Sequence, residues 1–365
     1  MAYGGWESFS GLNSNTDLYA GPLTVQPFAN ASFNIGAVGS GRFGVGKSIT
    51  LSNDGGNAQY AVRAWSANGG WVAVNCSGAT LLTGPASCYM APCLVYNSVT
   101  NTFQCGAFYD TSGTVYLSRG ATTGGPQNVL ATFPNAVPNP LAWHSFALVY
   151  FVAPSGGSMN FYCDGLLVAS VTGVNTSQDG TSGVTGVGFG QKPNNTGGGL
   201  FADFAFGDTT GSVGNVPPGI GVGGHAVLAL FPASDQTPLA WTPRTGSVHY
   251  NEVDETSMDG DLTYVAANTV GAADQYGTSG FPGGLLPAVI YGAQVKLAMR
   301  LDAAGSRTVQ PQITSGATVA TAAAVTVNNV SYSYANGLFL VDPATSAAWT
   351  TGGIAAAWIG QKLAS

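Results

Sequence analysis

Short apolar runs separated by turn residues recur along the chain, and this pattern limits its fold more than any other feature. Residues 93–97, 102–110 and 114–120 are rich in Val, Phe, Tyr and Cys, with Asn, Ser and Gly between the runs. Runs of this length with such boundaries are typical of a β-meander. In "MNFYCDGLLVASV", Asp164 and Gly165 favour a two-residue hairpin turn, because that turn needs positive φ at both positions. The pattern predicts an all-β protein.

The scarcity of charged residues supports the same fold class. Asp, Glu, Lys and Arg make up 7% of the 365 residues, compared with about 25% in an average globular protein. Gly alone occupies 53 positions. Long amphipathic helices need charged side chains on their outer faces, so the composition disfavours helix-covered parallel sheets and the nucleotide hydrolases built on them.

Charge and hydropathy also limit the partners. The chain has 17 acids and 10 bases, a net charge of −7, and no basic stripe. Binding to nucleic acid depends on Lys and Arg that neutralise phosphates, so we expect no nucleic-acid partner. The start "MAYGGWESFSG" lacks the basic and apolar regions of a signal peptide, and no apolar run reaches the length of a bilayer. We therefore expect a protein made in a cytoplasm, without membrane insertion.

A Gly- and Pro-rich stretch divides the chain. "GSVGNVPPGIGVGG", residues 211–224, has no apolar periodicity and predicts a linker. It separates an N-terminal domain, residues 1–210, from a C-terminal domain, residues 225–365, both of ordinary domain size. In the second domain we expect strands within residues 225–232, 262–268, 285–303, 317–327 and 337–343. The fold class we predict is two β-sandwich, jelly-roll-like domains in tandem.

The octapeptide "GRFGVGKS", residues 41–48, matches the pattern of a phosphate-binding loop. In such a loop a helix begins at the Lys-Ser pair and directs its N-terminal N–H groups at the phosphates. Here Lys47 and Ser48 are followed by "ITLSNDGG", whose β-branched residues and glycines disfavour a helix. We therefore interpret the stretch as a glycine turn into a strand, with Lys47 exposed.

Five cysteines leave three alternatives open. One close pair, Cys88 and Cys93, is flanked almost symmetrically by Cys76 and Cys105. The fifth cysteine, Cys163, lies far from them in the sequence. Free buried thiols are the favoured interpretation, because Cys is a commonly buried residue and a cytoplasm is reducing. A disulfide formed after release from the cell and a four-thiolate zinc site are the alternatives.

Acids and histidines supply little catalytic machinery. The first domain has one glutamate, Glu7, and none of its predicted strands carries the carboxylate pair that a glycosidase needs. The chain has three histidines, His144, His225 and His249, and neither His144 nor His225 has a nucleophile or orienting acid at an informative spacing. From these residues we predict that the chain is not an enzyme.

The one acidic cluster lies in "NEVDETSMDGDLTYV", residues 251–265. It contains Glu252 together with Asp254, Glu255, Asp259 and Asp261. A solvated turn and a calcium-stabilised loop are both consistent with it, since calcium takes carboxylate oxygens, although the spacing is not that of an EF-hand. The last four acids are the candidate calcium ligands, and no other cofactor is expected.

Four stretches of the first domain resemble, in order, the concanavalin-like or laminin-G-like jelly roll. They are "SGRFGVGKSITLS", "WHSFALVYFV", "MNFYCDGLLVASV" and "LFADFAF". The matching positions are Gly41 to Gly44, Trp143 and His144, Phe161 to Gly165, and Asp203. The resemblance covers most of residues 5–210 and implies a β-sandwich. The paired acids with which calcium-dependent lectins of this type hold the ion have no counterpart here.

The second domain resembles a C-terminal module of tailed-bacteriophage virion proteins. The resemblance is carried by "LFPASDQTPLAWTP", "VDETSMDGDLTYV" and "VDPATSAAWTTGGIAAAWIGQK", in which Asp342 replaces the usual Asn before Pro343. It implies a structural protein exposed on the tail, neck or capsid of a phage particle. Such a protein acts by docking on other virion proteins, commonly as a homo-oligomer. The alternative that the resemblance implies is a carbohydrate-binding adhesin that recognises glycans of the host surface.

Overall fold

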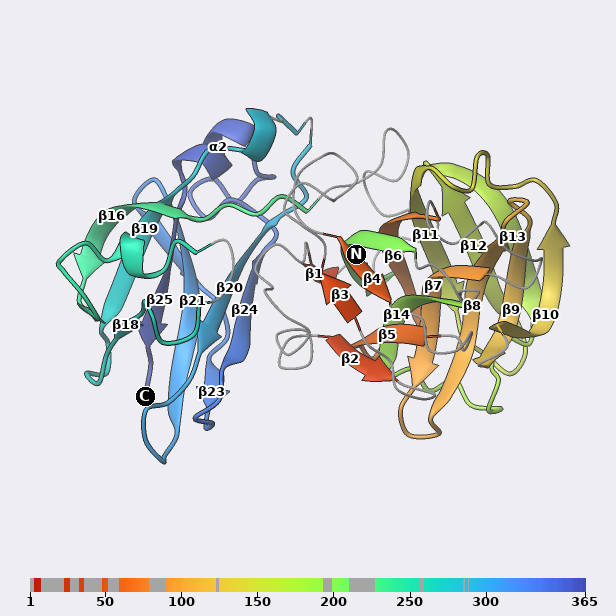
Figure 1. Ribbon diagram of the computed structural model, residues 1–365, viewed down its shortest axis with the longest axis horizontal. Helices are drawn as coiled ribbons and strands as arrows, with labels where there is room; N and C mark the ends of the chain where they lie inside the picture. Colours follow the sequence, from red (N-terminus) through yellow and green to blue (C-terminus); the bar gives the residue numbers. More distant parts are fainter. Residues whose placement is uncertain are drawn as a thin grey trace. The chain divides into compact units, whose positions relative to one another are not determined.

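The computed structural model divides the chain into two compact units, of which the first extends to Val227 and the second comprises residues 228–365 (Figure 1). The described residues are 3–7, 23–26, 33–35, 48–51, 59–78, 89–122, 125–192, 199–209, 227–255, 259–284, 286–287 and 289–365. Each unit is treated by itself. The predicted linker, residues 211–224, lies outside the described residues, so the boundary stays a prediction. No helix within the described ranges is both long and apolar enough to cross a membrane.

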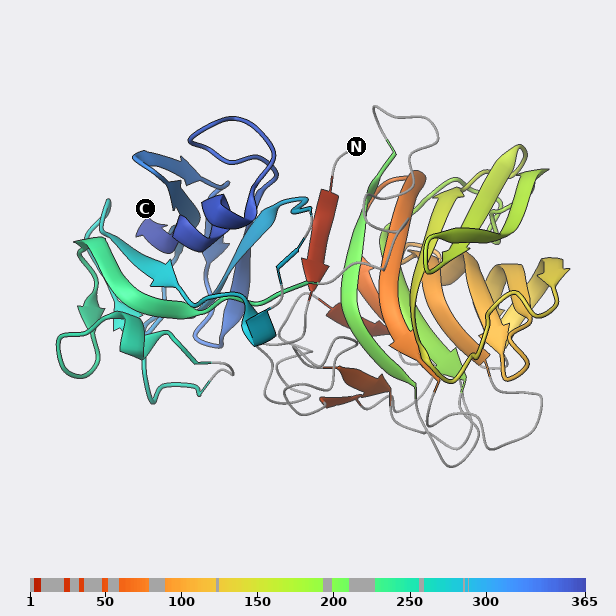
Figure 2. The ribbon, with the colours of Figure 1, turned by 90° about the horizontal axis from the view of Figure 1, so that it is seen from above.

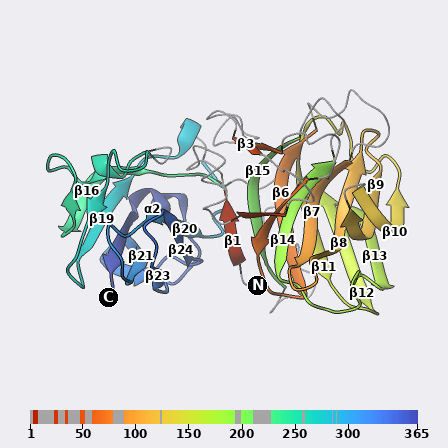
Figure 3. The same ribbon diagram turned by 60° about the horizontal axis from the view of Figure 1, so that its bottom comes forward.

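The first unit is a sandwich of two antiparallel sheets, as the strand pattern predicts (Figures 2 and 3). One sheet has the order β13-β12-β11-β6-β15-β4-β3, with β1 paired to β15, and the other has the order β10-β9-β8-β7-β14-β5-β2. The first sheet comprises β1 (Tyr3–Glu7), β3 (Phe33–Ile35), β4 (Ile49–Leu51), β6 (Gly69–Ser77), β11 (Trp143–Phe151), β12 (Gly157–Cys163), β13 (Leu166–Val174) and β15 (Leu200–Asp208). The second comprises β2 (Leu23–Gln26), β5 (Gln59–Ala64), β7 (Tyr89–Asn97), β8 (Thr102–Asp110), β9 (Val115–Thr122), β10 (Gly125–Phe133) and β14 (Gly186–Lys192).

Aromatic side chains join the two sheets. Phe146 of β11 stacks on Tyr109 of the opposite sheet, with ring centroids 5.1 Å apart, and on Phe161 of β12, with centroids 5.5 Å apart. Phe189 of β14 packs in the same way against Phe201 of β15. All five side chains are buried. The sandwich interior is therefore built on the alternate residues of the aromatic runs seen in the sequence.

The Asp-Gly hairpin is confirmed. Asp164 and Gly165 have φ values of 46° and 85° and join β12 to β13. Both φ values are positive, which the predicted turn requires. Two strands, β6 and β10, were not predicted. Their sequences, "GGWVAVNCS" and "GPQNVLATF", carry Gly, Asn or Gln among the apolar residues, which weakens the strand pattern.

The end of the phosphate-loop octapeptide leads into a strand. Ser48 is fully buried, and β4 begins at the next residue, Ile49. Residues 41–47, including Lys47, lie outside the described residues. Because no helix follows Ser48, no helix N-terminus is available there for a phosphate.

We expect the purified protein to bind neither ATP nor GTP. When the protein is titrated into a fluorescent ATP or GTP analogue, the anisotropy of the analogue should show no saturable rise. The Lys47→Ala variant should give the same result. Tight binding by the wild-type chain that Lys47→Ala abolishes would show that the motif is functional.

The second unit is a smaller β-sandwich. Its six-stranded sheet has the order β16-β19-β25-β21-β22, with β23 also paired to β21, and a two-stranded ribbon, β20-β24, packs over one face. The strands are β16 (Pro232–Leu239), β19 (Ala273–Thr278), β20 (Ala293–Met299), β21 (Arg307–Ser315), β22 (Thr318–Thr321), β23 (Val325–Val327), β24 (Ser333–Phe339) and β25 (Trp358–Leu363). A second short pair joins β17 (Thr242–Pro243) to β18 (Val265–Ala266). Val295, Ile313 and Phe339 lie in the core between sheet and ribbon.

Two predicted strands of this unit are placed wrongly. In the run 225–232 the ladder begins only at Pro232, because Leu230 and its apolar neighbours pack against the core without a pairing strand. In the run 285–303 only β20 is a strand, and Pro287, which has no N–H to donate, lies in the irregular segment before it. The short helix α2 (Thr351–Ala356) was also not anticipated, although Thr350 caps it by accepting the N–H of Gly353.

Candidate functional site

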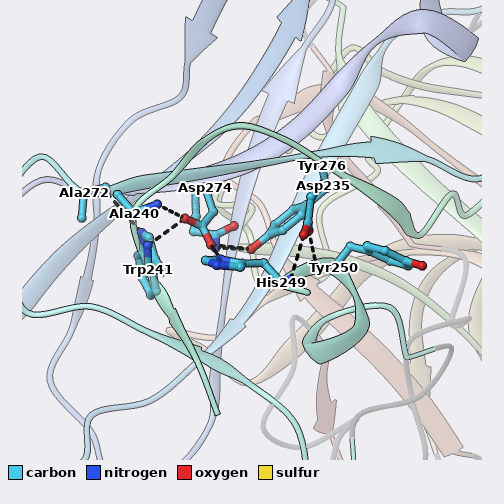
Figure 4. A network of polar contacts seen from close by, with 9 residues as sticks. Asp235, Ala240, Trp241, His249, Tyr250, Ala272, Asp274 and Tyr276 are labelled. Carbon is cyan, nitrogen blue, oxygen red and sulfur yellow. Dashed lines mark hydrogen bonds and ion pairs between the residues drawn. The ribbon is translucent and has the colours of Figure 1, made fainter. Parts of the chain in front are cut away.

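A fully buried carboxylate, Asp274 on β19, organises one end of the second unit (Figure 4). Its Oδ1 accepts the backbone N–H groups of Ala240 at 2.6 Å and Trp241 at 2.8 Å. Its Oδ2 lies 2.7 Å from Nδ1 of His249 and accepts the Tyr276 hydroxyl at 3.0 Å. Four donors on one carboxylate stabilise its charge, and they tie residues 240–241 and His249 to β19.

A second carboxylate extends this network. Asp235 on β16 accepts the backbone N–H of His249 at 3.0 Å and that of Tyr250 at 2.7 Å (Figure 4). The loop that carries His249 is therefore tied to two neighbouring strands through both its backbone and its ring. Trp241 completes the assembly by donating its indole N–H to the carbonyl of Ala272 at 3.2 Å.

The aspartate and histidine pair has the geometry of an orienting carboxylate with an imidazole. Asp274 is completely buried, whereas the His249 side chain keeps 12% of its surface exposed. The contact with Asp274 is made by Nδ1, so it fixes the orientation of the imidazole ring. Sequence spacing did not reveal this pair, because Asp274 is 25 residues away in the chain and only tertiary pairing joins the two residues.

The acids of the predicted calcium loop are drawn to different partners. Asp261 forms a bidentate pair with Arg300, at 2.8 Å for both contacts, and also accepts the Tyr332 hydroxyl. Glu255 and Asp259 both contact the hydroxyl of Thr263. Burial and the nearby negative charges of Asp259 and Asp254 raise the pKa of Glu255. The structure thus brings Glu255 and Asp259 together and directs Asp261 to a cation of the protein itself.

Glu252, the first acid of that cluster, is a structural acceptor. It is buried and accepts the backbone N–H and hydroxyl of Thr245 and the backbone N–H of Tyr264. Burial alone would raise the pKa of Glu252, but these hydrogen bonds outweigh it and hold the pKa below its usual value. The calcium loop itself stays a prediction.

In the first unit a chain of buried polar groups crosses the face of β15, β6 and β11. Asn75 donates to Asp203 at 2.7 Å and accepts the hydroxyl of Ser145 at 2.6 Å. Asp203, at φ 52°, also accepts the N–H of Val227 at 3.0 Å. Asp203, singled out by the resemblance to the jelly roll, therefore fastens the chain that leaves the unit.

His144 lies at the other end of the same polar chain. Its Nδ1 is 2.6 Å from Oδ2 of Asp164, and its Nε2 is 3.1 Å from the carbonyl oxygen of Asn139. The prediction that His144 has no orienting acid is therefore wrong, because the hairpin turn after β12 brings Asp164 to its ring. Asp164 also accepts the N–H of Ser145. Cys163 lies close by, and one ligand atom from each of His144, Cys163 and Asp164 falls within 4.8 Å of the others. This set contains ligand types suited to zinc, but the direct contact between His144 and Asp164 occupies two of the three donors.

The described cysteines are free and buried. These are Cys76, Cys93, Cys105 and Cys163, and Cys88 lies outside the described residues. Burial raises the pKa of Cys93 and of Cys105, so both are neutral thiols at physiological pH. The favoured interpretation of free buried thiols is confirmed for these four residues. His225 also lies outside the described residues.

Asp179, in the loop before β14, accepts several hydrogen bonds on both of its carboxylate oxygens. Oδ2 accepts Asn97, Thr100 and Gln104 at 2.6–2.9 Å, and Oδ1 accepts the backbone N–H and hydroxyl of Thr181. Burial opposes the effect, but the hydrogen bonds hold the pKa of Asp179 well below its usual value. The loop is therefore fastened to the turn between β7 and β8.

We expect Asp179→Asn to lower the melting temperature of the first unit near neutral pH. A carboxylate whose pKa is depressed by folding adds stability above its unfolded pKa of about 4, and this stability is lost as the pH falls below that value. The difference between wild type and variant should therefore narrow between pH 5 and pH 2 in scanning calorimetry. A difference that stays constant over this range would show that the charge of Asp179 contributes nothing, and Asp302→Asn, at an exposed acid, is the control.

Solved structures similar to this chain share its β-sandwich architecture at low identity. A Bacillus licheniformis β-glucanase aligns with a TM-score of 0.36 and 10% identity, over 56% of this chain and 98% of that one. A Bacillus subtilis protein of unknown function with a galectin-like fold gives a TM-score of 0.37, 11% identity and coverage of 57% and 96%. A carbohydrate-binding module from Bacillus subtilis gives a TM-score of 0.33 and 12% identity, over 50% of this chain and 94% of that one. These values assign neither an activity nor a ligand to this chain.

No family model matches the sequence. No curated protein matches it either.

The prediction that the chain is not an enzyme is wrong on this comparison. The similar structures include the β-glucanase and a Trypanosoma rangeli sialidase, the latter with a TM-score of 0.33, 13% identity and coverage of 56% of this chain and 30% of that one. The absence of a carboxylate pair from the predicted strands was the basis of the exclusion. Proteins of this architecture include enzymes, so that exclusion does not hold.

Proposed function

We propose that this chain is a structural component of a tailed-bacteriophage particle, exposed on its surface and docked on other virion proteins. The proposal rests first on the three stretches of the second unit that resemble a module of such proteins. It is supported by the poverty of charge, which leaves few ion pairs for changing salt to screen outside a cell.

One structural observation carries the proposal: the residues that define the resemblance in the second unit bond inward. Asp235 holds the loop at His249 and Tyr250, and Trp241 donates to the backbone. In the last stretch, Asp342 accepts the N–H of Ala344, Trp349 donates to the carbonyl of Phe339, and Thr350 caps α2. A motif whose side chains satisfy one another defines a scaffold, and it leaves the surface to make contact with partners.

The proposal is tested on purified particles. Mass spectrometry of gradient-purified virions should detect the chain at a stoichiometry comparable with that of known structural proteins, and gold-labelled antibody should decorate one part of the particle. Absence from purified virions, with the protein abundant in the same lysate, would contradict it.

The same function makes a prediction about assembly. Virion proteins act in closed symmetric sets, so we expect the purified chain to form a homo-oligomer or to bind a second protein of the particle. Light scattering after size exclusion measures the first, and co-purification from particles disassembled by mild denaturant measures the second. A strict monomer that co-purifies with no virion protein would count against docking.

A further inference from the structure

The face of the six-stranded sheet turned away from the β20-β24 ribbon carries a tryptophan among amides and hydroxyls. Trp358 on β25 lies directly across from Thr314 on β21 and from Gly277 on β19. In the next row, Gly360 lies between Gln312 and Gln275. Residues of a strand alternate between its two faces, so these side chains share one surface, opposite the face that holds Ile313 and Ile359 in the core.

Two polar side-chain atoms of this surface are buried without a hydrogen-bonding partner among the described residues. Gln312 is 6% exposed and Thr314 is 4% exposed, and among the described residues neither Oε1 of Gln312 nor Oγ1 of Thr314 has a hydrogen-bonding partner. Nε2 of Gln312 donates to the hydroxyl of Thr321 at 3.1 Å. A buried acceptor left unpaired costs about 1–3 kcal/mol, so such atoms on a sheet face indicate a missing partner.

The charge of the surface restricts that partner. Asp235 and Asp274, the acids of β16 and β19, bond to groups on the core side of the sheet. The strands contribute one cation to this surface, Lys362, which pairs across from Gln310. A partner that depends on charge, such as nucleic acid or an acidic peptide, finds little here to bind. A neutral partner with many hydroxyls matches the amides and the threonine.

We propose that this surface, centred on Trp358, binds a neutral glycan. Sugar rings stack their C–H faces on an indole, and hydroxyl groups supply both the donor that Oε1 of Gln312 lacks and a partner for the Thr314 hydroxyl. The Trp358 side chain is partly exposed, and no described residue accepts its indole N–H. Glycan contact with the two buried atoms requires a neighbouring side chain to turn aside. This glycan-binding proposal does not depend on the proposal that the chain is a virion protein.

The test uses the full chain on an array of neutral and charged glycans, followed by titration of the best soluble hit against intrinsic tryptophan fluorescence. We expect at least one neutral glycan to bind, and Trp358→Ala to weaken it tenfold or more. Tyr264→Ala is the matched control, because Tyr264 is an exposed aromatic of the same unit outside this surface, and it should leave binding unchanged.

Thr314→Val keeps the experiment decisive if Trp358→Ala fails to fold. The substitution preserves shape and removes an unpartnered hydroxyl, so it should leave the melting temperature unchanged or raise it while weakening glycan binding several-fold. Binding to no neutral glycan, binding to charged glycans only, or binding that survives both substitutions would overturn the proposal. A virion protein that binds no glycan here would leave the particle role standing, so the two proposals fail separately.

Discussion

Asp274→Asn is expected to destabilise the second unit by about 3–5 kcal/mol, a large part of the 5–15 kcal/mol that holds a typical domain folded. The carboxylate accepts two backbone N–H groups, the His249 ring and the Tyr276 hydroxyl in a fully buried site. An amide presents an NH₂ group to donors on one side and leaves them unpaired. Peptide-resolved hydrogen exchange should show loss of protection in β19 and in residues 240–250.

The matched control is Asp302→Asn, at an exposed aspartate of the same unit, which should change stability by less than about 0.5 kcal/mol. Protection of β8 and β11 in the first unit should stay unchanged in both variants. If Asp274→Asn behaves like the control, the network in Figure 4 is not what holds the loop in place.

Phe146→Ala should cost the first unit about 3–5 kcal/mol, because it removes a completely buried ring and leaves a cavity between the sheets. The ring stacks on both Tyr109 and Phe161, so two aromatic contacts are lost together. Urea unfolding followed by circular dichroism should show the transition of the first unit at a lower urea concentration than in the wild type.

Phe151 on the same strand provides the comparison. Its side chain is 45% exposed, so Phe151→Ala should cost less than about 1 kcal/mol. Equal effects of the two substitutions would mean that position in the sandwich does not determine the contribution of a ring, and the described core would be wrong.

Several strands of the first unit were predictable because their signals are local, although β6 and β10 were not predicted. β8, β11 and the Asp164-Gly165 hairpin are encoded in short stretches that combine apolar residues with an adjacent turn. The strand after Ser48 was predictable for the same reason, since the residues that follow favour a strand. In the second unit short paired segments and irregular loops alternate, and Leu230 of the predicted strand 225–232 packs against the core outside any strand.

The polar networks could not be predicted, because their members are far apart in the chain. Asp274 and His249 are 25 residues apart, and Asn75 and Asp203 are 128 residues apart. The glutamine and threonine row beside Trp358 likewise exists only in the strand register. The acidic cluster is conspicuous in the sequence because it is contiguous, but in the structure only Glu255 and Asp259 share a partner, whereas Asp261 and Glu252 bond elsewhere.

The hydrogen bonds of four motif residues limit how the sequence can change during evolution. These residues are Asp235, Trp241, Asp342 and Trp349. Substitutions at these positions are opposed by loss of folding, whereas exposed residues outside the motif carry no such constraint. Two chains that share the motif would therefore have the same architecture without having to bind the same surface. Differences in binding would lie at positions outside the motif.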